Sequence, residues 1–120
     1  MGEKLRIVMV EPGKPAYVAK IPPTLEAEQF IVGGPIATVR LDEGILVYND
    51  EGKLREMEGN RRLDNGSIIA GPFFLVGDGG DRFRSLTDTE VDHFLQRFAQ
   101  PEQISQREVW ADMGFKFLSF

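Results

Sequence analysis

The sequence predicts an α+β domain with a mixed or mainly antiparallel sheet of about five strands and helices packed on one face. Three observations predict this class. Short β-branched segments are separated by turn clusters, and a helix-capping motif precedes a stretch with helical apolar spacing. In addition, 42% of the 120 residues are hydrophobic, which is enough for a single core without metals or disulfides.

A β-hairpin is predicted at the start of the chain. Leu5 to Val10 is rich in aliphatic residues and ends at the turn cluster Glu11 to Pro15, and Ala16 to Ile21 has the composition of a second strand. A helix from Leu25 to Val32 follows, because Gly33-Gly34 is a usual C-terminal cap.

The apolar pattern of this helix leaves two alternatives. Ala27, Phe30 and Ile31 share one face, whereas Leu25 and Val32 lie opposite. The helix is therefore either short and well covered or partly irregular.

A second hairpin joins Ile36 to Leu41 with Ile45 to Asn49 through Asp42-Glu43-Gly44, and Lys53 to Gly66 is polar enough to be a long loop. Ile68 to Val76 is the most apolar run and is interrupted by Gly71-Pro72. We expect its second half, Phe73 to Val76, to be the central strand of the sheet.

Thr87-Asp88-Thr89-Glu90 has the spacing of a capping box, so a helix begins there. Its apolar stripe comprises Val91, Phe94, Leu95 and Phe98. A last helix is predicted within Glu102 to Asp112 and is closed by Gly114. The predicted order is β-β-α-β-β-loop-β-α-α in one domain, residues 1–120, with its C-terminal helix and tail at 101–120.

The composition removes several classes of function. There is no cysteine, and the only histidine, His93, lies off the apolar stripe and is predicted to face solvent. A net charge of −5 disfavours binding to nucleic acid, which requires cationic surfaces. Without a signal peptide or a long apolar run, we expect a cytoplasmic protein that does not enter membranes.

The charged segment around Asn60, Arg61 and Arg62 is a candidate site for an anion or a partner. Together with Arg84, and with His93 as a further contributor, these side chains would suit a phosphate or carboxylate group if the fold brings them together. The alternative is that the arginines pair with neighbouring carboxylates or are solvated. Convergence on one concave pocket distinguishes the two.

No residue is assigned to catalysis, to a cofactor or to a metal. Gly77-Asp78-Gly79-Gly80-Asp81 lacks the ending of a phosphate-binding loop and the remaining ligands of a calcium loop, so it is interpreted as a turn.

The last residues, Phe115 to Phe120, alternate in the manner of a strand. Phe115, Phe117 and Phe120 either dock on the domain's own sheet or form an interface with a partner, including a second copy of the chain.

Several segments in order resemble a family of small bacterial and phage proteins known only as a domain of unknown function. The segments are Val10 to Lys14, Leu25 to Gly34, Asn60 to Leu63, Ile69 to Gly77 and Phe83 to Thr87. The resemblance covers roughly residues 4–99 and implies a cytosolic protein carried on plasmids, prophages and conjugative elements. It supplies no activity and no catalytic residues.

Two functional hypotheses follow. The first is an accessory or interaction domain that binds a macromolecular partner, most simply a protein. The second is a small domain that binds or hydrolyses an anionic ligand through the segment Asn60 to Arg62.

Overall fold

The structure, a computed structural model, describes residues 3–114. It has the predicted α+β class, with an antiparallel main sheet in the strand order β2-β1-β7-β4-β3. The strands of this sheet are β1 (Leu5–Val10), β2 (Tyr17–Ile21), β3 (Ile36–Leu41), β4 (Gly44–Asn49) and β7 (Phe73–Asp78), with the short β8 (Phe83–Arg84) paired to β7. Both predicted hairpins are present, and Phe73 to Val76 lies in the central strand, as predicted.

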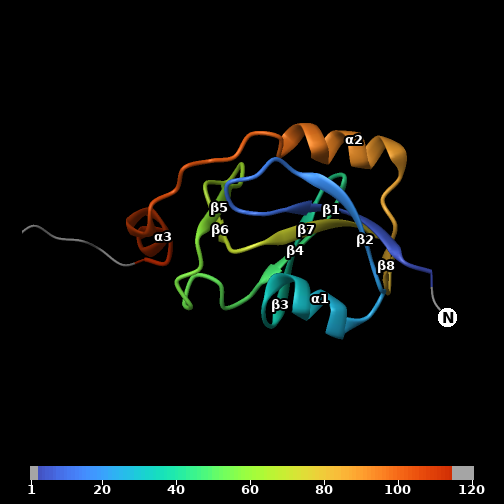
Figure 1. Cartoon of the computed structure of the whole chain (residues 1–120), viewed down its shortest axis with the longest axis horizontal. Helices are drawn as coiled ribbons and strands as arrows, with labels where there is room; N and C mark the ends of the chain where they lie inside the picture. The colour runs from blue at the N-terminus through green and yellow to red at the C-terminus, as the bar shows by residue number, and fades with distance from the viewer. Residues whose placement is uncertain (1–2, 115–120) are drawn as a thin grey trace, which may run out of the picture.

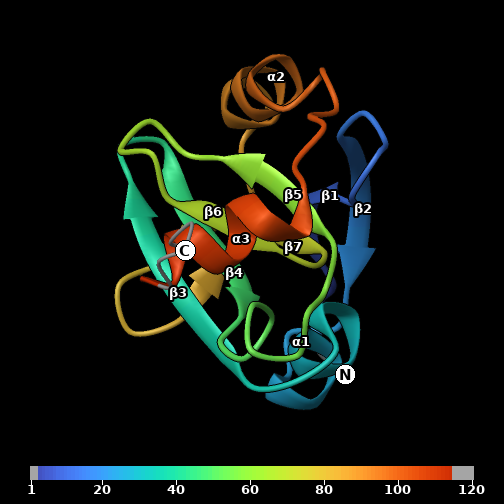
Figure 2. The ribbon, with the colours of Figure 1, turned by 90° about the vertical axis from the view of Figure 1, so that its left-hand side faces the viewer.

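The helices lie on both faces of the main sheet, not on one as the sequence suggested (Figures 1 and 2). α1 (Leu25–Val32) covers one face, and α2 (Asp88–Arg97) covers the other. The physical reason is visible in β7, where Phe73 and Leu75 point to the α2 side and Phe74 and Val76 point to the α1 side. A strand that is apolar on both sides requires cover on both sides.

The segment predicted as a long loop, Lys53 to Gly66, contains a strand. β5 (Gly59–Arg62) pairs with β6 (Ile68–Ala70) in a separate two-stranded sheet. β6 is the first half of the apolar run Ile68 to Val76, which divides at Gly71 because that residue has a φ of 83° in the left-handed region. The polar composition of β5 did not indicate a strand, because Asn60 and Arg61 are polar side chains that form hydrogen bonds inside the domain.

The second half of the chain contains both predicted helices, and one is shorter than expected. α2 has the complete capping box at Thr87 and Glu90. α3 (Gln106–Asp112) begins only at its cap residue Ser105, so Glu102 to Ile104 are not helical. α3 packs on β6 at one end of the domain, where Ile68, Ala70 and Val109 form a small separate core (Figure 1).

Candidate functional site

Asn60 and Arg61 are structural residues of the interior, although the sequence placed them in an exposed loop. Their exposed fractions are 0% and 1%. Asn60 Nδ2 donates hydrogen bonds to the carbonyl oxygens of Val10 (3.0 Å) and Gly71 (2.9 Å). Asn60 therefore connects β5 to β1 and to the break between β6 and β7.

The Arg61 guanidinium joins three parts of the chain. Nη1 donates to the carbonyl and side-chain oxygens of Asn60, and Nη2 donates to the carbonyl oxygens of Lys14 (2.7 Å) and Phe98 (2.9 Å). Nε is buried without a partner. Burial lowers the pKa of Arg61, which nearby Glu102 partly opposes. Four of the five N–H donors are satisfied inside the protein, so Arg61 has little capacity to bind an external anion.

Arg62 points outward from the same strand. Its Nη1 donates to the Gly66 carbonyl oxygen (3.2 Å), and its Nη2 lies 3.9 Å from the Glu108 carboxylate on α3. Arg62 is thus near a carboxylate, but its partner is Glu108 on α3 and not one of the sequence neighbours that the alternative named.

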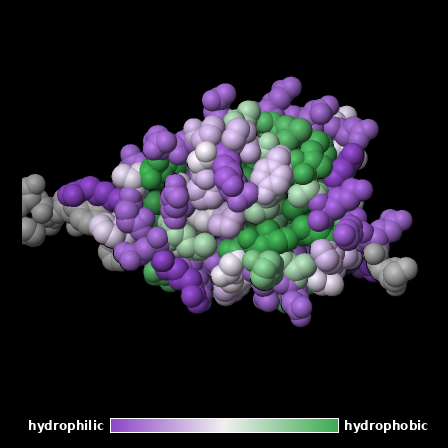
Figure 3. Space-filling model, in the orientation of Figure 1, coloured by the Kyte–Doolittle hydropathy of each residue, from purple (hydrophilic) through white to green (hydrophobic). Residues whose placement is uncertain are grey.

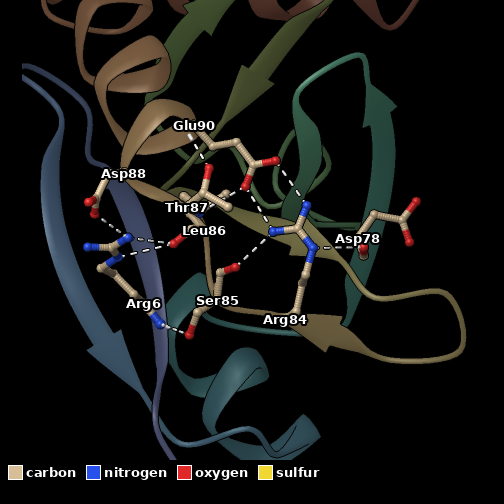
Figure 4. Close-up of polar contacts among 8 residues, drawn as sticks. All are labelled: Arg6, Asp78, Arg84, Ser85, Leu86, Thr87, Asp88 and Glu90. Carbon is tan, nitrogen blue, oxygen red and sulfur yellow. Dashed lines mark hydrogen bonds and ion pairs between the residues drawn. The ribbon is translucent and has the colours of Figure 1, made fainter.

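Arg84 forms an ion pair at the N-terminal end of α2 (Figure 4). Its Nη1 and Nη2 each lie 2.9 Å from one oxygen of Glu90, and Nε donates to the Asp78 carbonyl oxygen. This bidentate pair lowers the pKa of Glu90 to about 2. A Cβ atom at Gly77 would overlap the Arg84 side chain, so a larger residue there would displace Arg84.

The predicted arginines do not converge. Arg61 bonds to Phe98 just after the C-terminal end of α2, whereas Arg84 bonds to Glu90 in the first turn of that helix. His93 lies between them on α2, half-exposed, with Nε2 3.2 Å from a Glu43 carboxylate oxygen. The concave anion pocket that the second hypothesis required is not formed by these side chains.

The segment Gly77 to Asp81 is a turn only in part, because Gly77 and Asp78 are the last residues of β7 and pair with β8. The turn follows them, and the Gly80 N–H donates to Asp78 Oδ1 (2.9 Å) there. Between residues 3 and 114, no three or more histidine, aspartate or glutamate side chains are grouped so that they could hold a metal ion. In the same part of the chain, no helix has the length and apolar character needed to cross a bilayer.

An apolar groove lies between β2 and α1 (Figure 3). The odd-numbered residues of β1 and β2 point to the α1 face, and α1 packs on β3, β4 and β7 beside them. These residues of β1 and Ile21 are buried there, whereas Tyr17 and Ala19 of β2 are more exposed. The groove has a volume of about 290 Å³. Its lining includes Ile7, Met9, Tyr17, Ala19, Ile21 and Phe30.

Exposed apolar side chains gather around this groove. Phe30 on α1 is 86% exposed, and Tyr17 on β2 is 43% exposed. The Tyr17 hydroxyl donates to the Glu11 carboxylate, which raises the pKa of Tyr17 to about 12. β2 is also an edge strand, and within residues 3–114 no other strand pairs with its outer side.

Sequence reasoning missed this surface. It placed Phe30 on the same face as Ala27 and Ile31, but the side of α1 that is buried carries Glu28 and Val32. The signal was present in the two apolar faces of this short helix, because a sheet can cover only one of them. Phe115, Phe117 and Phe120, the predicted interface residues, lie outside the described residues.

The fold and this surface together define a small α+β domain with a two-sided antiparallel sheet, an open edge strand and an apolar groove beside it. The chain belongs to the family of the domain of unknown function DUF3846, whose model matches residues 5–99. The match confirms the resemblance to a domain of unknown function and ends after α2. No curated protein and no solved structure matches the chain.

Proposed function

We propose that this domain is a protein-interaction module that binds an extended segment of a partner protein along β2. The observation that carries the proposal is an open edge strand with apolar surface beside it. An edge strand presents unpaired backbone N–H and C=O groups, and an added strand satisfies them. The binding function requires no catalytic group.

The groove supports apolar side chains at alternate positions of the bound segment. A strand beside β2 directs every second side chain toward the α1 face, where Tyr17, Ala19 and Phe30 lie. Exposed aromatic side chains at the rim of a groove are typical of binding surfaces, because they bury large areas on contact. The bound segment is short, because Pro15 and Pro22 flank β2 and cannot donate to a ladder.

The edge strand at the other side of the sheet favours this choice. β3 exposes Thr38 and Arg40, and Arg40 forms an ion pair with Asp78 across the α1 face. Charged and polar side chains on an edge strand discourage strand addition. β2 also carries an exposed charged residue, Lys20, but it adjoins the apolar groove, so it is the edge that we propose to accept a partner.

The family resemblance and the composition also bear on where this function takes place. A cysteine-free sequence fits a reducing compartment, so we propose a cytoplasmic location. From the family resemblance we also propose that the protein is encoded on mobile genetic elements.

The test is an NMR titration with a synthetic peptide in which valine alternates with threonine between terminal lysines. We expect saturable shifts at the amides of β2 and about a tenfold weaker affinity for Phe30→Ser. The matched control is Leu54→Ser, because Leu54 is 72% exposed but lies away from the groove. The same peptide with a central proline should not bind, since it cannot complete a ladder.

Equal losses for Phe30→Ser and Leu54→Ser would contradict the proposal. So would a concentration-dependent dimer in sedimentation that Phe30→Ser abolishes, because a second copy would then be the occupant of the surface.

A further inference from the structure

Glu28, on the inner side of α1, is a nearly buried residue whose carboxylate faces a pocket. Glu28 is only 7% exposed, and its carboxylate has no hydrogen-bond or ion-pair partner among residues 3–114, but its oxygens are not fully buried and keep contact with the solvent of the pocket. Glutamate is almost never buried to this extent unless it is paired, because removing a charge from water is costly. Such an exception requires an explanation.

Glu28 lines a pocket of about 560 Å³ at the end of the β1–β2 hairpin. Leu5, Pro23 and Phe83 supply apolar walls, and Asp81 and Arg82 supply charged groups. Arg82 and Asp81 are 84% and 90% exposed in their side chains and lie 3.9 Å apart. The pocket therefore combines an apolar interior, the Glu28 carboxylate and an exposed charged rim.

The donor set limits what this pocket can hold. Glu28 and Asp81 do not form part of any described group of three or more metal-ligating side chains, so a metal ion lacks sufficient ligands. A ligand with an apolar stem and a cationic end matches both features of the pocket. Its methylene groups would contact Leu5 and Pro23, and its charge would lie near the Glu28 carboxylate and the Phe83 ring.

We propose that this pocket binds a primary alkylammonium group, from either a free amine or a lysine side chain. The pocket shares no described lining residue with the groove between β2 and α1. The proposal thus goes beyond the function proposed above, and the two can fail separately.

The experiment is an NMR titration of the full chain with three probes. n-Pentylammonium represents a free amine, N-acetyl-lysine N-methylamide represents a lysine side chain, and 1-pentanol is a neutral control. We expect saturable shifts at the amides of Leu5, Glu28 and Phe83 with one or both cations. Binding of the lysine derivative assigns the site to polypeptide ligands, and binding of n-pentylammonium alone assigns it to free amines.

Two conservative variants test the role of the carboxylate. Glu28→Gln keeps the size of the side chain and should weaken cation binding about tenfold, the loss expected for one charge-assisted contact. Glu26→Gln is the matched control, because Glu26 is an exposed carboxylate on the same helix. Its affinity should stay within about twofold of the wild type.

Three results would overturn the proposal. The first is the absence of saturable shifts with either cation. The second is binding of 1-pentanol as tightly as n-pentylammonium, or equal losses in the two glutamine variants. The third is cation binding that appears only in Arg82→Ala, because Arg82 would then occupy the pocket in the native chain.

Discussion

At the scale of single residues, two buried charged side chains have opposite roles. Arg61 is buried and donates to four oxygen acceptors, with only Nε unpaired, whereas the Glu28 carboxylate has no partner among the described residues and faces a pocket. A satisfied buried cation stabilises the structure that positions its acceptors. A partly desolvated anion without a partner reduces stability.

Arg61→Ala should strongly destabilise the domain. The substitution leaves the carbonyl oxygens of Lys14 and Phe98 without donors and opens a cavity, so we expect a loss of about 3 kcal/mol in the free energy of unfolding. Urea denaturation measures it. Arg62→Ala, on the exposed side of β5, should cost less than about 1 kcal/mol, and equal losses would contradict the structural role of Arg61.

Glu28→Gln should increase stability at neutral pH. Burial raises the pKa of Glu28, so the folded state binds a proton more tightly than the unfolded state. The stability that Glu28 contributes is therefore complete below its ordinary pKa and is lost as pH rises through the raised value.

The pH dependence provides the control for this prediction. Thermal unfolding of both proteins should show a higher midpoint for Glu28→Gln at pH 7 and equal midpoints near pH 3, where both side chains are neutral. A lower midpoint for the variant at pH 7 would mean that the carboxylate has a favourable partner in the free protein.

At the scale of elements, the start of α2 is the best-specified part of the chain. Its capping box was predicted from Thr87 and Glu90 alone, because the motif is local. The bidentate contact from Arg84 was not predictable, since it depends on the hairpin of β7 and β8 (Figure 4).

Glu90→Gln should remove the ion pair with Arg84 and keep the helix cap, because the amide oxygen can still accept a hydrogen bond from the Thr87 N–H. The pKa of Glu90 is lowered to about 2, mainly by Arg84, so its contribution is present above the ordinary pKa and is lost as pH falls toward 2. We expect a loss of about 1 kcal/mol at pH 7 in urea denaturation, a modest value because Arg84 is partly exposed.

The loss should shrink as the pH approaches 2. Asp92→Asn, an exposed change on the same helix, serves as the control and should have little effect at either pH. A loss for Glu90→Gln that does not change with pH would assign the effect to packing.

The elements that sequence could not predict are those stabilised by distant contacts. β5 is polar in composition, and it forms a strand because Asn60 and Arg61 bond to carbonyl oxygens of β1, the first hairpin turn and the end of α2. Side-chain periodicity contains no signal for such contacts. The same limit explains why Arg61 was interpreted as a surface residue.

At the scale of the whole molecule, the main sheet forms the core of the domain and also presents the edge strand β2 and its groove. The class, both hairpins, the central strand and the capped helix were predictable, because short-range patterns determine them. The placement of α1 across the sheet was not, because strand order decides it. α1 packs on β3, β4 and β7, and the groove lies beside it over β1 and β2.

The most direct test of this account is amide hydrogen exchange with and without the valine–threonine peptide. Strand addition at β2 predicts slower exchange at the outward amides of Tyr17 to Ile21, with no change at β3. Protection at β3, or binding of the peptide without protection at β2, would contradict the claim that β2 and its groove form the binding surface.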